Sequence, residues 1–147
     1  MTTQVTEVSV QTDVEQKDSS TFVRNALKAN AVFSSLSGIA FLVAAKPIAA
    51  FLGLSMSTVL IITGIILLIF AADIFYLATR KIVNPKGVMA VIAADALWVV
   101  GSIILLVTNV VPLSTEGKWA VGLVAVVVAT FADLQYFGLR KILSKVQ

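Results

Sequence analysis

The chain has 147 residues, of which 59% are hydrophobic and 13% are charged, and its formal net charge is +3. A soluble domain carries about 25% charged and about 45–50% apolar residues, so one small core cannot hide this excess and we expect lipid to cover it. The basic residues flank apolar segments and form no continuous patch, which argues against nucleic acid as a partner.

Two residue types are missing from the chain, cysteine and histidine. Without cysteine there is no disulfide, no thiolate metal site and no thiol nucleophile. Without histidine there is no imidazole ligand for haem or an ordinary zinc site, and no serine–histidine pair. We therefore expect no cofactor, no metal site and no catalytic activity.

Residues 1–20 are polar and acidic, with four acids against the single base Lys17. Their composition predicts a disordered cytoplasmic tail, because such a segment cannot bury enough apolar surface to fold. The basic and apolar regions of a cleaved signal peptide are also missing from these residues.

The first apolar span is predicted over residues 30–45, where the pair Lys46-Pro47 interrupts it. Proline disfavours a helical conformation in the residue before it and suits the first turn of a new helix. We therefore expect a break at Lys46 and then a short interfacial or re-entrant segment over 47–54. A single kinked span is the alternative.

Three further spans are predicted over residues 58–79, 88–109 and 119–138, each with one charged residue. A helix needs about 20 residues to cross the hydrocarbon core of a bilayer. Residues 21–147 are therefore predicted to form an all-α, polytopic membrane four-helix bundle.

The basic residues predict the orientation of this bundle. Nine of them flank the spans on one side, in the N-terminal flank, in the loop after the second span and in the C-terminal tail. Only Lys46 and Lys118 lie on the other side. Because positive residues stay in the cytoplasm, we expect both termini there.

An internal repeat is the next feature of the sequence. The segment Ala72-Asp73-Ile74-Phe75-Tyr76-Leu77-Ala78-Thr79-Arg80-Lys81-Ile82 returns 60 residues later, with an acid, a tyrosine and an Arg-Lys pair at matching places. The first and third spans match at an offset of 65, where Asn30 aligns with Asp95. The chain is thus predicted to contain two copies of one helical hairpin, related by an axis along the membrane normal.

Polar residues lie at similar depths in these spans. Asp73 and Asp133 each precede an arginine by seven residues, Asp95 follows Lys86 by nine, and Asn30 is shallower. Helical spacing extends them into stripes, which hold Asp95, Trp98 and Ser102; Asp133, Tyr136 and Arg140; and Asp73, Tyr76 and Arg80.

Acids inside a membrane usually face the bundle interior, where they are paired, neutral or functional. One hypothesis is a polar cavity open to the cytoplasm, in which one of the three aspartates binds a proton, a cation or a polar ligand. In the alternative, Asp73 and Asp133 pair with Arg80 and Arg140. Asp95 and Asn30 then bond across the bundle to Ser, Tyr or Trp residues, and Trp98 packs in the core instead of forming a wall of the cavity.

Three stretches carry a resemblance to known proteins: residues 30–38, residues 93–102 and residues 133–142. They resemble segments of small four-span bacterial membrane proteins, and the layout of residues 24–143 is similar to the DoxX-like four-helix membrane group. The resemblance implies the fold and a place in the bacterial inner membrane. It implies no activity.

These observations favour a non-catalytic integral membrane protein, an accessory or scaffold subunit with a polar intramembrane cluster. The alternative is a small proton- or cation-coupled transporter that uses Asp73, Asp95 and Asp133. A membrane enzyme without histidine or cysteine ranks lowest. The expected partners are the lipid bilayer and, within it, a second copy of the chain or a larger membrane complex.

Overall fold

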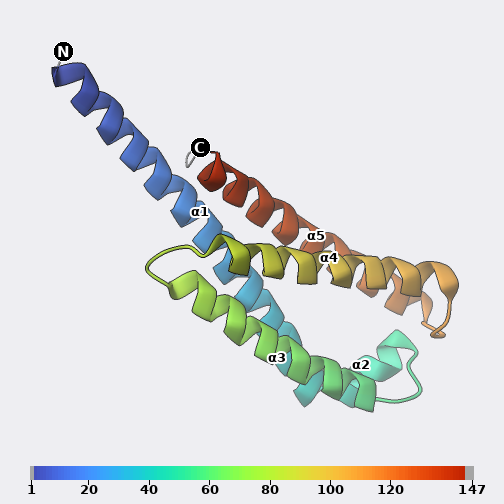
Figure 1. The fold of residues 1–147 in the computed structure, drawn as a ribbon. Helices are drawn as coiled ribbons and strands as arrows, with labels where there is room; N and C mark the ends of the chain where they lie inside the picture. The colour runs from blue at the N-terminus through green and yellow to red at the C-terminus, as the bar shows by residue number, and fades with distance from the viewer. Residues whose placement is uncertain (1, 145–147) are drawn as a thin grey trace.

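A computed structural model describes residues 2–144, which form five helices and no strand (Figure 1). The helices are α1 (Thr2–Val43), α2 (Ala45–Leu52), α3 (Thr58–Thr79), α4 (Pro85–Thr108) and α5 (Thr115–Leu143). All except α2 hold a stretch long and apolar enough to cross a membrane. The predicted all-α architecture with four membrane helices is therefore confirmed, and the chain is an integral membrane protein.

The long helices pack as two antiparallel pairs, α1 with α3 and α4 with α5 (Figure 1). The pairs join mainly where α1 lies along α5, whereas contact between α3 and α4 is slight. A pseudo-twofold repeat would pair α3 with α4 as closely as α1 with α5. Because the packing is unequal, the internal repeat stays a prediction from the sequence.

The core lies at the end of the bundle from which α1 projects. Its buried side chains come from all four long helices and are Val23, Leu27, Ala31, Ile74, Ala78, Val88, Val91, Leu139 and Ile142. At the opposite end a smaller cluster packs α2 against α3 through the buried Ala45, Ala49 and Leu60, and Phe41 of α1 packs against it. The bundle is therefore closed at one end, while the two pairs diverge at the other (Figure 1).

The N-terminal segment differs from its prediction. Residues 2–20, predicted to be disordered, are helical and continuous with the membrane span of α1, which begins at Lys17 (Figure 1). No proline precedes Pro47 and no glycine precedes Gly38. A helix nucleated in the span therefore extends outward at little cost, because propagation adds one hydrogen bond per residue fixed.

The break after the first span lies at Ala44, two residues before the predicted Lys46. Pro47 explains the break, since it lacks an N–H and its ring clashes with the carbonyl four residues earlier, that of Val43. α2 then ends at Gly53, whose φ of 80° is the left-handed conformation that glycine adopts most easily. The expected segment after the break is thus a short helix, separated from α1 by the single residue Ala44.

Two glycines let α1 and α3 approach closely. A Cβ atom built on Gly64 would lie 2.9 Å from the carbonyl oxygen of Gly38, and one on Gly38 would lie 2.9 Å from that of Gly64. Both distances are too short for real side chains, so any larger residue separates the backbones. Small residues at such crossings are typical of membrane helices, whose association depends on close packing.

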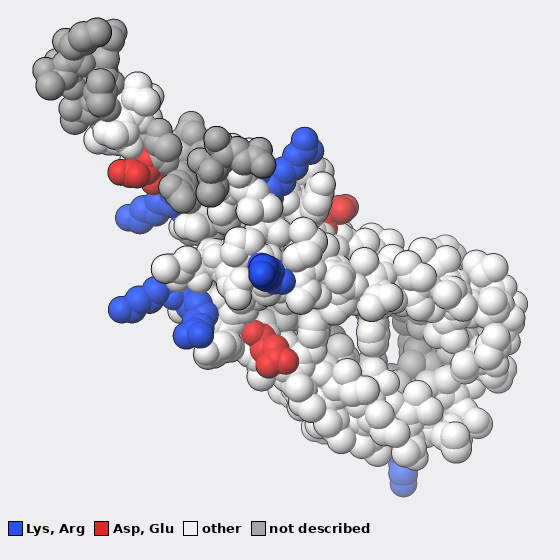
Figure 2. Space-filling model, viewed as in Figure 1, with Lys and Arg blue, Asp and Glu red and all other residues white. Residues whose placement is uncertain are grey.

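Lys and Arg side chains gather at the closed end of the bundle (Figure 2). One of them, Arg24 of α1, donates to the carbonyl of Ala78 at 2.9 Å and to that of Lys81 at 2.8 Å. Its guanidinium also donates to the carbonyl of Arg80. These carbonyls end α3 without intrahelical partners, and a cation there also complements the helix dipole.

Candidate functional site: a buried amide–carboxylate cluster

Three polar side chains from three helices meet inside the bundle, next to the core. Asp95 of α4 is 2% exposed, Asn30 of α1 is 1% exposed and Gln135 of α5 is fully buried. The Nδ2 atom of Asn30 donates to Oδ2 of Asp95 at 2.7 Å, and Nε2 of Gln135 donates to the same oxygen at 3.4 Å. The Ser34 hydroxyl extends the cluster by donating to Oδ1 of Asn30 at 3.3 Å.

Helical periodicity explains why these residues meet. The buried face of α4 holds Val88, Val91, Asp95 and Ser102, which follow one another at steps of three, four and seven residues. Gln135 likewise shares the buried face of α5 with Val128, Leu139 and Ile142. On α1, Asn30 and Ser34 lie one turn apart, next to the buried Ala31. The packing of these apolar faces brings the polar residues together.

One acceptor in the cluster has no partner among the described residues, the Oε1 atom of Gln135. An unsatisfied buried acceptor costs roughly 1–3 kcal/mol. Two amides and one carboxylate can satisfy one another fully only if a further donor is present. Turning the Gln135 amide over would not supply this donor, because Nε2 would then occupy the unpartnered position.

The described residues do not bring the three predicted aspartates together, because Asp73 and Asp133 are exposed and only Asp95 is buried. Asp133 lies two residues from the buried Gln135, which is roughly 200° around a helix. Asp73 lies on the side of α3 opposite the buried Ala71, Ile74 and Ala78. The same side chains that build the core therefore turn both carboxylates outward.

The described residues also do not show the alternative, in which these two acids form ion pairs with the arginines. Within residues 2–144, Asp73 and Asp133 form no ion pair with Arg80 or Arg140. The guanidinium of Arg80 lies 4.7 Å from the ring centroid of Tyr76, a cation–π contact. Seven residues along a helix span about 10 Å, so such a pair would need an extended arginine side chain directed back along the helix.

The remaining predicted site residues lie outside the cluster. Tyr76 and Tyr136 are 60% and 46% exposed, and Trp98 is 36% exposed, so Trp98 is neither a core residue nor an enclosed wall. Ser102 is buried, but its hydroxyl donates to the Trp98 carbonyl of its own helix at 2.8 Å. Of the three aspartates and the asparagine predicted to form the site, only Asn30 and Asp95 meet, and they bond to each other.

Sequence reasoning missed Gln135, although it lies inside the repeated motif next to Asp133. A signal was present. Gln135 follows Val128 by seven residues and precedes Leu139 by four, and residues at this spacing share one helix face. The prediction instead used the helix face that carries Asp133, which is nearly opposite the face of Gln135.

Comparison of the chain with protein-family models, with curated proteins and with solved structures found no match.

Proposed function

We propose that this chain is a non-catalytic membrane subunit that serves an assembly as an accessory or scaffold protein. The observation that carries the proposal is the exposure of Asp73 on α3 and Asp133 on α5, each inside an apolar span. On insertion scales an acid at the centre of a span costs about 2.5–3.5 kcal/mol. A partner helix that offers a donor or a base to these carboxylates would remove much of that cost.

The buried cluster supports a scaffold role. It joins α1, α4 and α5 through the side chains of Asn30, Asp95 and Gln135. Interhelical hydrogen bonds of this kind are worth about 0.6 kcal/mol on average in membranes, so they fix the packing more than they add stability. A bundle with fixed packing and with exposed carboxylates that a partner helix could bind suits an assembly subunit.

The proposal includes the location predicted from the sequence, the bacterial inner membrane with both termini in the cytoplasm. The nine basic residues on one side of the spans support that orientation. The partner is then expected to meet Asp73 and Asp133 within the cytoplasmic half of the membrane.

A second candidate function is proton or ligand binding at Asp95, as a small transporter requires. The observation that favours it is the unpartnered Oε1 atom of Gln135 beside the carboxyl group. Binding of a proton to Asp95 would turn part of this acceptor into a donor, so the hydrogen bonds with Asn30 and Gln135 would change with its protonation. Proton-coupled uptake into vesicles that is abolished by Asp95→Asn would favour this candidate over the first.

Purification of the full chain from membranes in mild detergent, followed by native mass spectrometry, tests the subunit proposal. We expect the wild-type chain to carry a protein partner in fixed stoichiometry. Asp73→Asn and Asp133→Asn should release it, whereas Asp13→Asn, in the part of α1 before its membrane span, should not. A chain that is alone in every preparation would refute the proposal.

A further inference from the structure

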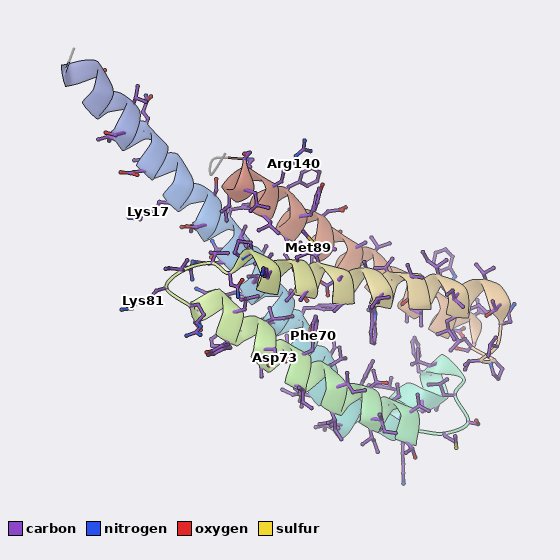
Figure 3. All side chains as sticks on the ribbon, in the orientation of Figure 1. Lys17, Phe70, Asp73, Lys81, Met89 and Arg140 are labelled. Atoms are coloured by element: carbon purple, nitrogen blue, oxygen red, sulfur yellow. The ribbon has the colours of Figure 1, made fainter. Side chains whose placement is uncertain are left out.

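We propose that the closed end of the bundle holds a binding site for one anionic phospholipid, between α4 and α5. A hollow of about 340 Å³ lies there, lined by Met89, Tyr136, Leu139, Arg140, Leu143 and Ser144. Figure 3 labels Met89 and Arg140, which come from the two helices that border it. Its lining includes neither the residues of the buried cluster nor Asp73 and Asp133.

The residues that line the hollow are polar at one end and apolar at the other, as a phospholipid is. Arg140 and Ser144 lie on the last turns of α5, where the chain leaves the apolar span. Tyr136 lies one turn deeper, at the depth where tyrosine rings favour the membrane interface. Met89, Leu139 and Leu143 supply apolar surface. A phosphate group next to Arg140 and an acyl chain against the apolar side chains would match this order.

The positive charge beside the hollow favours an anionic lipid over a neutral one. Arg140, which lines the hollow, is exposed, and Lys86 lies one turn before the lining residue Met89 on α4. Guanidinium groups bind phosphate oxygens through two parallel hydrogen bonds. Asp133 lies two turns below Arg140, about 10 Å along the helix, and forms no ion pair with it within residues 2–144.

The repeated motif offers a matched comparison. Arg80 follows Asp73 and Tyr76 at the same spacings as Arg140 follows Asp133 and Tyr136. The Arg80 guanidinium, however, already lies over the ring of Tyr76, and neither residue lines the hollow. Replacing either arginine removes the same charge at the same end of the bundle, but only one replacement should empty the site.

Native mass spectrometry of the purified full chain titrated with dioleoyl phosphatidylglycerol tests the proposal. We expect one tightly held lipid, an apparent Kd weakened about fivefold or more by Arg140→Gln, and little change with Arg80→Gln. Dioleoyl phosphatidylcholine should bind more weakly. Glycerophosphate at the same concentrations should not compete, because it lacks the acyl chains that contact Met89 and Leu143.

A second pair of variants separates lost charge from lost folding. Met89→Trp keeps every charge but fills the hollow, so it should reduce binding of the phosphatidylglycerol probe. Leu97→Trp, on an exposed part of the same helix, should not. Equal losses with Arg80→Gln and Arg140→Gln, full binding by Met89→Trp, or competition by glycerophosphate would overturn the proposal.

Discussion

The Asn30 side chain of α1 donates a 2.7 Å hydrogen bond to the Asp95 carboxylate of α4, and both residues are almost completely buried. The two helices belong to different antiparallel pairs. A polar bond in the bundle interior therefore joins the two halves of the fold at the end where its core is formed.

Asp95→Ala should lower stability more than Asp95→Asn does. Alanine leaves the buried donors of Asn30 and Gln135 without an acceptor, at a cost of roughly 1–3 kcal/mol, whereas asparagine keeps an acceptor oxygen. Thermal unfolding in detergent should show a clear fall in Tm for Asp95→Ala. The exposed Asp73→Ala is the control, and equal Tm values for Asp95→Ala and this control would contradict the bonding described here.

Gly64→Ala should separate α1 from α3. Its Cβ atom would meet the Gly38 carbonyl at 2.9 Å, and the overpacking is expected to cost about 1–3 kcal/mol. Gly101→Ala is the matched control, because a Cβ atom there meets nothing within 4 Å and alanine favours a helix. The same thermal melts measure both, and a Gly64→Ala protein as stable as Gly101→Ala would disprove the close crossing.

Arg24→Gln should loosen the C-terminal end of α3. Glutamine cannot donate to the Ala78, Arg80 and Lys81 carbonyls together, and it removes the charge that complements the helix dipole. Hydrogen exchange should become faster in residues 76–84 and stay unchanged in α5. The exposed Lys28→Gln, one turn along α1, should leave exchange as in the wild type, and an identical pattern in both variants would rule out a specific role for Arg24.

Ser114→Ala should weaken the contact between α2 and α5, although the backbone bond from residue 114 to the Leu52 carbonyl is kept. The Ser114 hydroxyl donates to the Phe51 carbonyl at 2.6 Å and accepts from the Gly117 amide at 2.9 Å, so it caps α5 and binds the end of α2. Loss of such a cap costs about 0.5–2 kcal/mol. We expect faster hydrogen exchange in α2, with the exposed loop variant Ser55→Ala as the control; unchanged exchange in α2 would contradict this link.

The number and type of the helices were predictable because long apolar runs show which segments lie in lipid. The predicted span over residues 58–79 has the same bounds as α3. Which face of each helix packs inside the bundle was harder to predict, because lipid-facing and core-facing residues of a membrane helix are equally apolar. Asp73, Asp95 and Asp133 look alike in the sequence, yet only Asp95 lies on a face that packs.

Contacts between helices determine which polar residues belong to the buried cluster. The Gly38–Gly64 crossing fixes how α1 meets α3, and the buried Ile74 then turns Asp73 outward. Gln135 joins the cluster because the α5 face that carries Leu139 and Ile142 packs into the core. Which of these side chains meet depends on how each helix is rotated about its own axis. That rotation is set by packing between helices and cannot be read from one segment alone.

The most direct test of the central claim is photo-crosslinking in intact membranes from Ile69. This residue is exposed and lies one turn before Asp73 on the same face of α3. The account predicts a discrete protein adduct from position 69, lost when Asp73→Asn is added and absent from the control position Val107 on α4. Adducts only with lipid, or a protein adduct that is unchanged by Asp73→Asn, would contradict a partner bound through this carboxylate.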